Sequence, residues 1–373
     1  MLRFGRRPEF KAILVQNISK KREILIMTKK LSVDLKLFCP REDCPYRNDS
    51  KNRITKDGFY TTKNDSERRQ MLYCCGGKHR YSETSYSELW GKQGSFKEYE
   101  QAAKLFCYGL SADAIADVLG KDVRTITTWL LSMSKKSKLF HETMCLNLTM
   151  VLSFIQMDEL WSFLNKKKRQ LWVFIGFDVD SRFWINFQLG SCTNHNAKKL
   201  VTGIKSWLKG TKDTVLKITT DKLAAYQNAI KTVLSDVTHV YMQVVKRRKN
   251  KRLVTVKKCF VKGSETDFTG KTQNTSYIER FNLTLRQRTS YLCRKTLGFC
   301  KKQSNLEAVL WLNLFDYNYR RIHKGLRIAI DDATKKKLFT RKWKHRTPGM
   351  ALGLTNQTLT WRFLFIAPIP LTH

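Results

Sequence analysis

Three acidic residues that lie far apart in the sequence could together bind divalent metal ions. Asp158 lies in an apolar run, Asp221 follows a second one, and Glu279 lies in a segment with helical periodicity. Hard divalent ions such as Mg²⁺ prefer oxygen ligands, and three converging carboxylates repel one another unless cations lie between them. Two ions bridged by Asp158 could activate a water or a 3′-hydroxyl and stabilise the leaving oxygen. These acidic residues are therefore the candidate catalytic residues.

Each acidic residue also has an alternative explanation in the sequence. Glu159 follows Asp158 directly and could take its place as a ligand, or both could be polar residues at a strand edge. Asp221 could cap the helix that is predicted after it. Ser276 and Glu279 have the spacing of a capping box, which would give the glutamate a purely structural role. Residue types and spacing leave both explanations open.

Glu279 shares one face of its predicted helix with two polar residues. Asn282 and Arg286 follow it at offsets of three and seven, and residues with these offsets stack over two turns of a helix. A carboxylate two turns from a guanidinium could hold a metal ion at one end and a phosphate at the other. The pattern makes Arg286 a candidate for binding phosphate.

The region around the first two acidic residues has the pattern of an α/β domain. Strands are predicted at 151–161, 171–177, 183–189 and 215–220, and helices at 197–208 and 223–230. Three consecutive strands, a crossover helix, a further strand and more helices is the order of a ribonuclease H-like domain, which we assign to residues 150–335. The first and fourth strands of such a sheet are neighbours, so Asp158 and Asp221 can meet. Glu279 would come from a helix packed against that edge.

A group of cysteines with a histidine near the N-terminus has the pattern of a structural zinc site. The chain has ten cysteines, which should be reduced in a cytosolic protein unless they bind metal. Two cysteine-containing segments separated by a polar loop predict a zinc-ribbon-like module at residues 31–95. The predicted ligands are Cys39, Cys44, Cys75 and His79, with Cys74 as the alternative to Cys75. Two clusters of reduced cysteines around a hairpin would explain the same pattern.

Three predicted helices follow the cysteine-rich module and form an all-α domain at residues 96–142. They cover 96–108, 111–119 and 122–131, and serine caps and glycines mark their ends. This arrangement is typical of a helix-turn-helix, whose third helix enters the major groove. Arg124, Thr125 and Thr128 are then candidate DNA contacts, although an ordinary three-helix packing unit would have the same pattern. The lysine cluster at 135–138 is predicted to be a solvated linker.

The composition indicates a polyanionic partner. The chain carries 70 Lys and Arg against 31 Asp and Glu, a formal net charge of +39, and nucleic acid is the usual partner of such an excess. Lys246, Arg247 and Arg248 are predicted to contact a DNA backbone, although a solvated charged loop is the alternative. The sequence has no 18-residue apolar run and no secretory pattern, so we expect no membrane contact and a cytoplasmic location.

The two ends of the chain are basic. Residues 1–30 form a basic N-terminal arm, and residues 336–373 are first basic and then apolar. The apolar stretch at 361–366 could dock on the catalytic domain or on a second subunit, and the sequence does not distinguish the two.

Several motifs together resemble the transposases of the insertion sequence 1 family. The resemblance covers most of residues 35–360 in the same order and rests on these matches: 158–162, 167–170, 178–181, 220–221 with Tyr226, 278–286, 294–296, 323–327 and 346–355. It implies a DDE transposase whose metal-binding catalytic acids are Asp158, Asp221 and Glu279. It also implies that Arg286 contacts the DNA end.

The resemblance further implies partners and cofactors. An N-terminal zinc ribbon and helix-turn-helix would bind the terminal inverted repeats of double-stranded DNA. The catalytic domain would cleave the 3′ end and join it to target DNA with two Mg²⁺ ions, for which Mn²⁺ could substitute. We expect a homodimer or a larger homo-oligomer, because two ends must be joined, and a nucleoid-associated location. A decayed end-binding regulator and a structure-selective nuclease are the alternative functions.

Overall fold

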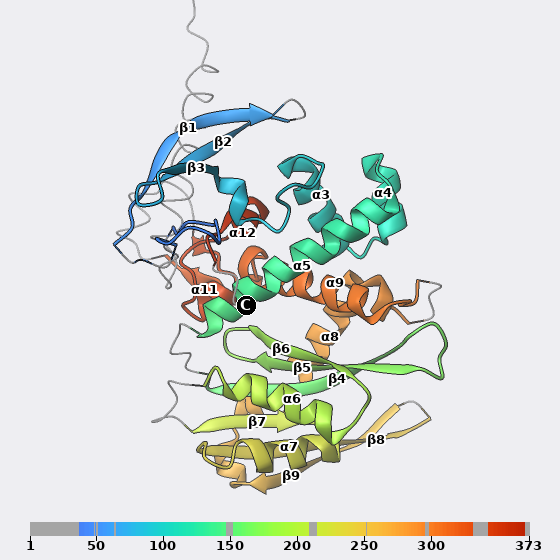
Figure 1. The fold of residues 1–373 in the computed structure, drawn as a ribbon. Coiled ribbons are helices and arrows are strands. Elements are labelled where there is room, and N and C mark those ends of the chain that lie inside the picture. The colour runs from blue at the N-terminus through green and yellow to red at the C-terminus, as the bar shows by residue number, and fades with distance from the viewer. Residues whose placement is uncertain are drawn as a thin grey trace, which may run out of the picture.

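The computed structural model places a three-stranded and a six-stranded β-sheet at opposite ends of a layer of helices (Figure 1), and β10 (Ile328–Ala329) and β11 (Trp343–Lys344) form a third, two-stranded sheet. It describes residues 37–47, 49, 51–62, 65–146, 152–208, 215–250, 252–294, 298–330 and 342–369. The predicted basic arm at 1–30 and the basic stretch at 336–341 lie outside the described residues. No helix within these ranges is long and apolar enough to cross a membrane.

The N-terminal sheet is small and antiparallel. It contains β1 (Ile54–Thr62), β2 (Asp65–Cys74) and β3 (His79–Ser82), and the 3-10 helix η1 (Glu83–Tyr86) follows. Its buried hydrophobic residues are three cysteines, one leucine and two tyrosines: Cys39, Cys44, Cys74, Leu72, Tyr81 and Tyr86. A core with so few aliphatic side chains gains little stability from hydrophobic burial alone, so we expect it to depend on a bound metal or on packing against the rest of the chain.

Three helices follow, and their starts agree with the sequence prediction. They are α3 (Phe96–Cys107), α4 (Ala112–Leu119) and α5 (Val123–Leu146). Ser95 and Glu98 form the predicted capping box, and Gly120 ends α4 with a positive φ of 59°.

The predicted linker at 135–138 is wrong, because α5 continues through it to Leu146. Apolar residues on both sides of the lysine cluster, among them Met133 and Phe140, keep the helical periodicity and are fully buried. Lys136 is 1% exposed, and its ammonium group donates hydrogen bonds of 2.7 Å to the carbonyl oxygens of Tyr86 and Ala367. The lysine cluster therefore belongs to a packed helix rather than to a solvated connection.

The large sheet is mixed and has the order β6-β5-β4-β7-β8-β9. Its strands are β4 (Phe154–Phe163), β5 (Gln170–Asp178), β6 (Trp184–Gly190), β7 (Leu216–Thr220), β8 (His239–Lys249) and β9 (Arg252–Lys262). The first three strands form an antiparallel meander, β7 is parallel to β4, and β8 is parallel to β7. The first and fourth strands are neighbours, as the sequence predicted.

Helices cover both faces of this sheet, which explains why β4 and β5 are largely apolar (Figure 1). Helices α6 (Asn194–Lys205) and α7 (Ala224–Val233) pack on one face, and α8 (Ser276–Arg288) and α9 (Gln303–Phe315) pack on the other. The remaining short elements are η2 (Glu265–Asp267), η3 (Gly270–Gln273), η4 (Ser290–Leu292), the π-helix η5 (Asp316–Arg320), η6 (Lys324–Leu326), β10 (Ile328–Ala329), β11 (Trp343–Lys344), α11 (Pro348–Ala351) and α12 (Trp361–Ile366).

The apolar C-terminal stretch docks on the N-terminal half of the chain. Helix α12 packs against α3, α5 and η1, and Phe365 stacks on Phe96 with 6.3 Å between ring centroids. One hydrophobic core contains α12, the three N-terminal helices and one face of the large sheet. Of the two possibilities that the sequence left open, the observed contact is within the chain and mainly with the helices.

Candidate active site and metal centres

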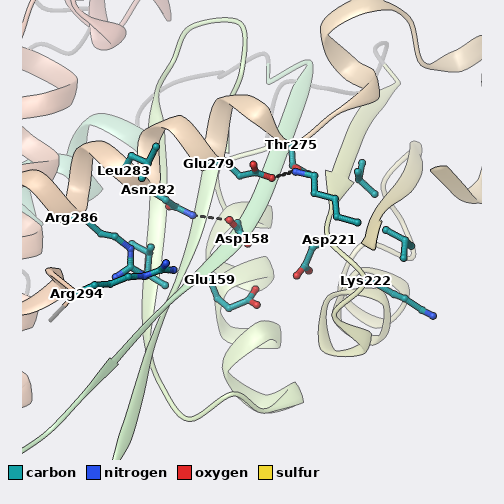
Figure 2. A pocket seen from close by; sticks show the side chains of 14 residues that line it. Asp158, Glu159, Asp221, Lys222, Thr275, Glu279, Asn282, Leu283, Arg286 and Arg294 are labelled. Atoms are coloured by element: carbon teal, nitrogen blue, oxygen red, sulfur yellow. Dashed lines mark hydrogen bonds and ion pairs between the residues drawn. The ribbon is translucent and has the colours of Figure 1, made fainter. Parts of the chain in front are cut away.

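The predicted acidic residues line one cavity of about 600 Å³ at the centre of the large sheet (Figure 2). Its walls come from β4, the end of β7, β8 and one face of α8. The charged and amide side chains that line it are Asp158, Glu159, Asp221, Lys222, Lys246, Glu279, Asn282, Arg286 and Arg294. The cavity therefore combines a negative floor with basic residues at its rim.

Strand register brings the two aspartates together. In the parallel pair of β4 and β7, Met157 lies opposite Thr220, and this is the last paired position. Asp158 and Asp221 are the next residues of the two strands, so both side chains reach the point where the pairing ends. Asp221 also accepts a 3.0 Å hydrogen bond from the backbone N–H of Leu223. Leu223 itself is the N-cap of α7, and no side chain caps this helix, so Asp221 does not have the alternative role of a helix cap.

Helix α8 is fixed over the cavity by a residue that the sequence reasoning missed. Gln156 is fully buried in β4, accepts a 2.9 Å hydrogen bond from the backbone N–H of Ile278, and donates one of 2.6 Å to the carbonyl oxygen of Asn274. The sequence feature that could have indicated this role is a glutamine within an otherwise apolar run. Because buried amides need partners, these two bonds hold the first turn of α8 on β4.

Glu279 lines the cavity, but its carboxylate contacts Lys246 and Thr275 and not the group formed by the two aspartates. Lys246 forms an ion pair with the Glu279 carboxylate, and the Thr275 hydroxyl donates a 2.6 Å hydrogen bond to the same Oε1 atom. Lys246, which was predicted to contact a DNA backbone, therefore points into the cavity. The predicted capping box of Ser276 is wrong: Ser276 is already the first residue of α8, and Thr275 precedes it.

The polar face of α8 is oriented as predicted. Asn282 donates a 2.7 Å hydrogen bond from Nδ2 to Oδ2 of Asp158, and Arg286 lines the cavity one turn further along. The Arg286 guanidinium donates a 2.7 Å bond to the carbonyl oxygen of Leu292, which holds it at the rim.

The acidic residues carry raised pKa values because they are buried close together. Burial and then the Asp221 carboxylate raise the pKa of Asp158 to about 7. Burial, Asp221 and then Asp158 raise the pKa of Glu159 to about 8. Burial also raises the pKa of Asp221, although a backbone hydrogen bond and Lys246 oppose the shift. A bound cation would reverse these shifts, because it favours the ionised carboxylates.

A second group of ligand atoms lies in the N-terminal module. Ligand atoms of Cys39, Cys44, Cys74 and His79 all lie within 4.8 Å of one another. Cys39 Sγ is 2.9 Å from His79 Nε2, and Cys44 Sγ is 3.9 Å from Cys74 Sγ. Sulfurs bound to one tetrahedral zinc lie about 3.8 Å apart, so the donor set and the spacing fit that ion.

Cys74 occupies the position that the sequence assigned to Cys75. Cys74 ends β2 and is fully buried, whereas Cys75 is half-buried and its sulfur lies 3.9 Å from the Thr55 hydroxyl. Consecutive residues at a strand end point in opposite directions, so only one of the two can face the other ligands. The first choice, Cys75, is therefore corrected to Cys74.

The residues around this site support ligand binding. Asn52 Nδ2 and the Gly77 N–H lie 3.2 and 3.3 Å from Cys74 Sγ. His79 Nδ1 is 2.8 Å from the Gly77 carbonyl oxygen, which leaves Nε2 free for a metal. A Cβ atom on Gly77 would come within 2.7 Å of Cys44 Sγ, so only glycine fits here.

Of the remaining predicted DNA contacts, those whose side chains the structure describes are exposed or half-buried. Arg124 and Thr128 are exposed in the first two turns of α5, and Thr125 is half-buried. Arg247 is exposed in β8. Arg248 belongs to the same strand, but its side chain lies outside the described part of the chain.

One stretch of the chain, residues 151–266, matches a family model of DDE-type transposases. The model is that of the IS1 transposase, so the resemblance found in the sequence is confirmed for these residues. The matched stretch contains Asp158 and Asp221 and ends before Glu279.

Two further comparisons add little. Among solved structures, a chain in the "Crystal structure of the Mos1 Strand Transfer Complex" aligns with 62% of this chain and 81% of its own length, at 10% identity and a TM-score of 0.22. A TM-score of 0.22 is too low to indicate a shared fold. No curated protein matches the chain.

Proposed function

We propose that this protein is a DNA transposase that cleaves the 3′ ends of its element and joins them to target DNA. The observation that carries the proposal is the convergence of Asp158, Asp221 and Glu279 on one cavity, in which the two aspartates belong to the stretch that matches the IS1 transposase. The strand order, with the first strand next to the fourth, supports a ribonuclease H-like fold for this domain.

In this proposal, each residue of the cavity has a distinct role. Asp158, Asp221 and Glu279 hold two Mg²⁺ ions, or Mn²⁺, which when bound activate the attacking oxygen and stabilise the leaving oxygen. Asn282 orients Asp158 through its amide. Arg286 and Arg294 at the rim bind phosphates of the DNA end, since guanidinium groups suit phosphate oxygens.

We propose that the N-terminal modules bind the terminal inverted repeats. The Cys39, Cys44, Cys74 and His79 group would hold a structural zinc ion. Helices α3 to α5 would act as a helix-turn-helix with Arg124, Thr125 and Thr128 near the bases. Exposed basic residues of the β8–β9 hairpin would contact backbone phosphates, and two copies or more would pair the ends at the nucleoid.

The test is a strand-transfer assay with supercoiled donor plasmid, candidate ends and Mg²⁺. Asp158→Asn should reduce cleavage by at least about 10³-fold, because it removes a metal ligand, while end binding stays within about twofold. Asp236→Asn is the control, since Asp236 is exposed and pairs with Lys205 away from the cavity. Normal cutting by Asp158→Asn would reject the assignment. Binding of ends by the wild type without cutting would favour a regulator, and cleavage selective for branched DNA would favour a nuclease.

A further inference from the structure

Glu159 is a fourth acidic residue at the cavity and has no role in the proposed triad. Its ligand oxygen lies within 4.8 Å of those of Asp158 and Asp221, whereas Glu279 is not part of this close group. We propose that Glu159, together with Asp158 and Asp221, binds a divalent cation in the DNA-free protein, before Glu279 takes part. This inference rests on the proposed function and adds a ligand to its metal site.

The end of strand pairing explains how neighbouring residues of one strand reach the same point. Asp158 faces α8, where Asn282 contacts it, and Glu159 faces α7 on the other side of the sheet. The register of β4 with β7 stops at Met157 and Thr220, so no paired residue of β7 lies beside the two acids. Figure 2 shows the carboxylates of Glu159 and Asp221 turned toward one another across this gap.

The hydrogen bonding around Glu159 is incomplete within the described residues. Its Oε2 atom is buried and has no hydrogen-bond partner in the part of the chain that the structure describes. The Tyr226 side chain is fully buried, and its hydroxyl faces Glu159; within the described residues this hydroxyl makes no hydrogen bond of normal geometry. Unpartnered buried carboxylate oxygens are costly, and a divalent cation among three carboxylates would satisfy them.

Glu279 is in the opposite situation. Its carboxylate is paired with Lys246 and bonded to Thr275, so its charge is already compensated. Figure 2 shows it turned toward Thr275 and away from Glu159. A cation that enters the DNA-free cavity therefore meets Asp158, Glu159 and Asp221, which form no ion pair within the described residues, whereas Glu279 becomes available only when Lys246 leaves it.

The experiment measures Mn²⁺ binding to the full-length protein without DNA, by the loss of the electron paramagnetic resonance signal of free Mn²⁺. Glu159→Gln should weaken binding by about tenfold or more, because it removes one charged ligand. Asp236→Asn is the control, because Asp236 pairs with Lys205 away from the cavity, and it should keep the wild-type affinity. Glu279→Gln tests the order of binding and should lose clearly less affinity than Glu159→Gln. Glu159→Asp keeps the charge but shortens the side chain, so it should give an intermediate affinity; it also serves if Glu159→Gln folds poorly.

Two outcomes would overturn the inference. One is wild-type Mn²⁺ affinity in Glu159→Gln with a normal circular dichroism spectrum, and the other is an equal loss in Glu279→Gln. Strand transfer by the wild type, measured in parallel, separates this inference from the proposed function. If the wild type cuts DNA and Glu159→Gln binds Mn²⁺ normally, only the role of Glu159 is rejected. If the wild type binds Mn²⁺ but cuts no DNA under any condition, the proposed function is rejected and the cation site stands.

Discussion

Asp158 depends on residues from three separate parts of the chain. β4 provides its backbone, Asn282 of α8 donates a hydrogen bond to it, and Asp221 at the end of β7 places a second negative charge nearby. These surroundings favour the protonated form of the aspartate when no cation is present. The same residue therefore lowers the stability of the empty protein and gives the site its affinity for metal.

The raised pKa of Asp158 predicts a pH-dependent difference between the wild type and Asp158→Asn. Burial and Asp221 raise the pKa from 3.8 to about 7 in the folded protein, so the folded state holds a proton that the unfolded chain releases. The stability that this proton contributes is present below about pH 4 and is lost as the pH rises through 7. Without Mg²⁺, the melting temperature of Asp158→Asn should rise relative to the wild type between pH 5 and pH 8.

Differential scanning calorimetry of both proteins at several pH values checks this prediction. Because the comparison is between two variants at each pH, the large net positive charge affects both equally. Adding Mg²⁺ at pH 8 should reduce the difference, since only the wild type has all its acidic ligands. A difference that stays constant from pH 5 to pH 8 would contradict a raised pKa at Asp158.

At the scale of elements, the N-terminal module is held together at the turn that joins β2 to β3. Two of the four clustered ligands, Cys74 and His79, come from the ends of these strands, and Cys39 and Cys44 precede the sheet. Few aliphatic side chains support the arrangement. The stability of the module should therefore depend on the metal.

Replacing the two adjacent cysteines separately tests which of them is the ligand. Cys74→Ser should lose most of the bound zinc and unfold the module, because a buried ligand is removed. Cys75→Ser is the matched control and should keep one zinc per chain, because its sulfur lies by Thr55. Elemental analysis and proteolysis of the module give the result. Zinc loss in Cys75→Ser with retention in Cys74→Ser would contradict the observed arrangement.

The periodicity of apolar residues predicted the helices and strands well, but it could not predict the directions in which individual side chains point. The strand order and the convergence of the two aspartates follow from apolar runs and their sequence, and the structure has both. The choice between Cys74 and Cys75 depends on the register of one hairpin, which chemically identical neighbours do not reveal. The pairing of Lys246 with Glu279 requires β8 to lie beside β7. Which strands are neighbours depends on contacts between distant parts of the chain, so the run of basic residues around Lys246 does not reveal this pairing.

At the scale of the whole molecule, Lys136 connects three parts of the chain that are distant in sequence. It lies in α5, and its amino group binds the carbonyl oxygen of Tyr86 in η1 of the N-terminal module and the carbonyl oxygen of Ala367 after α12. Burial lowers its pKa from 10.5 to about 7. A neutral amine can donate both bonds without the cost of burying a charge.

The lowered pKa of Lys136 predicts that the folded protein, in which this residue joins the modules, becomes more stable as the pH rises. Between about pH 7 and 10 the unfolded chain binds a proton at this lysine that the folded protein does not, so the free energy of unfolding rises with pH. Lys136→Met loses this dependence and leaves two buried carbonyl oxygens without donors. The melting temperature of the wild type relative to Lys136→Met should increase from pH 7 to pH 9.5.

Lys135→Met is the control, because Lys135 is exposed on the same helix and its difference from the wild type should not change with pH. A Lys136→Met difference that is equally flat would contradict a lowered pKa of Lys136 in the folded protein.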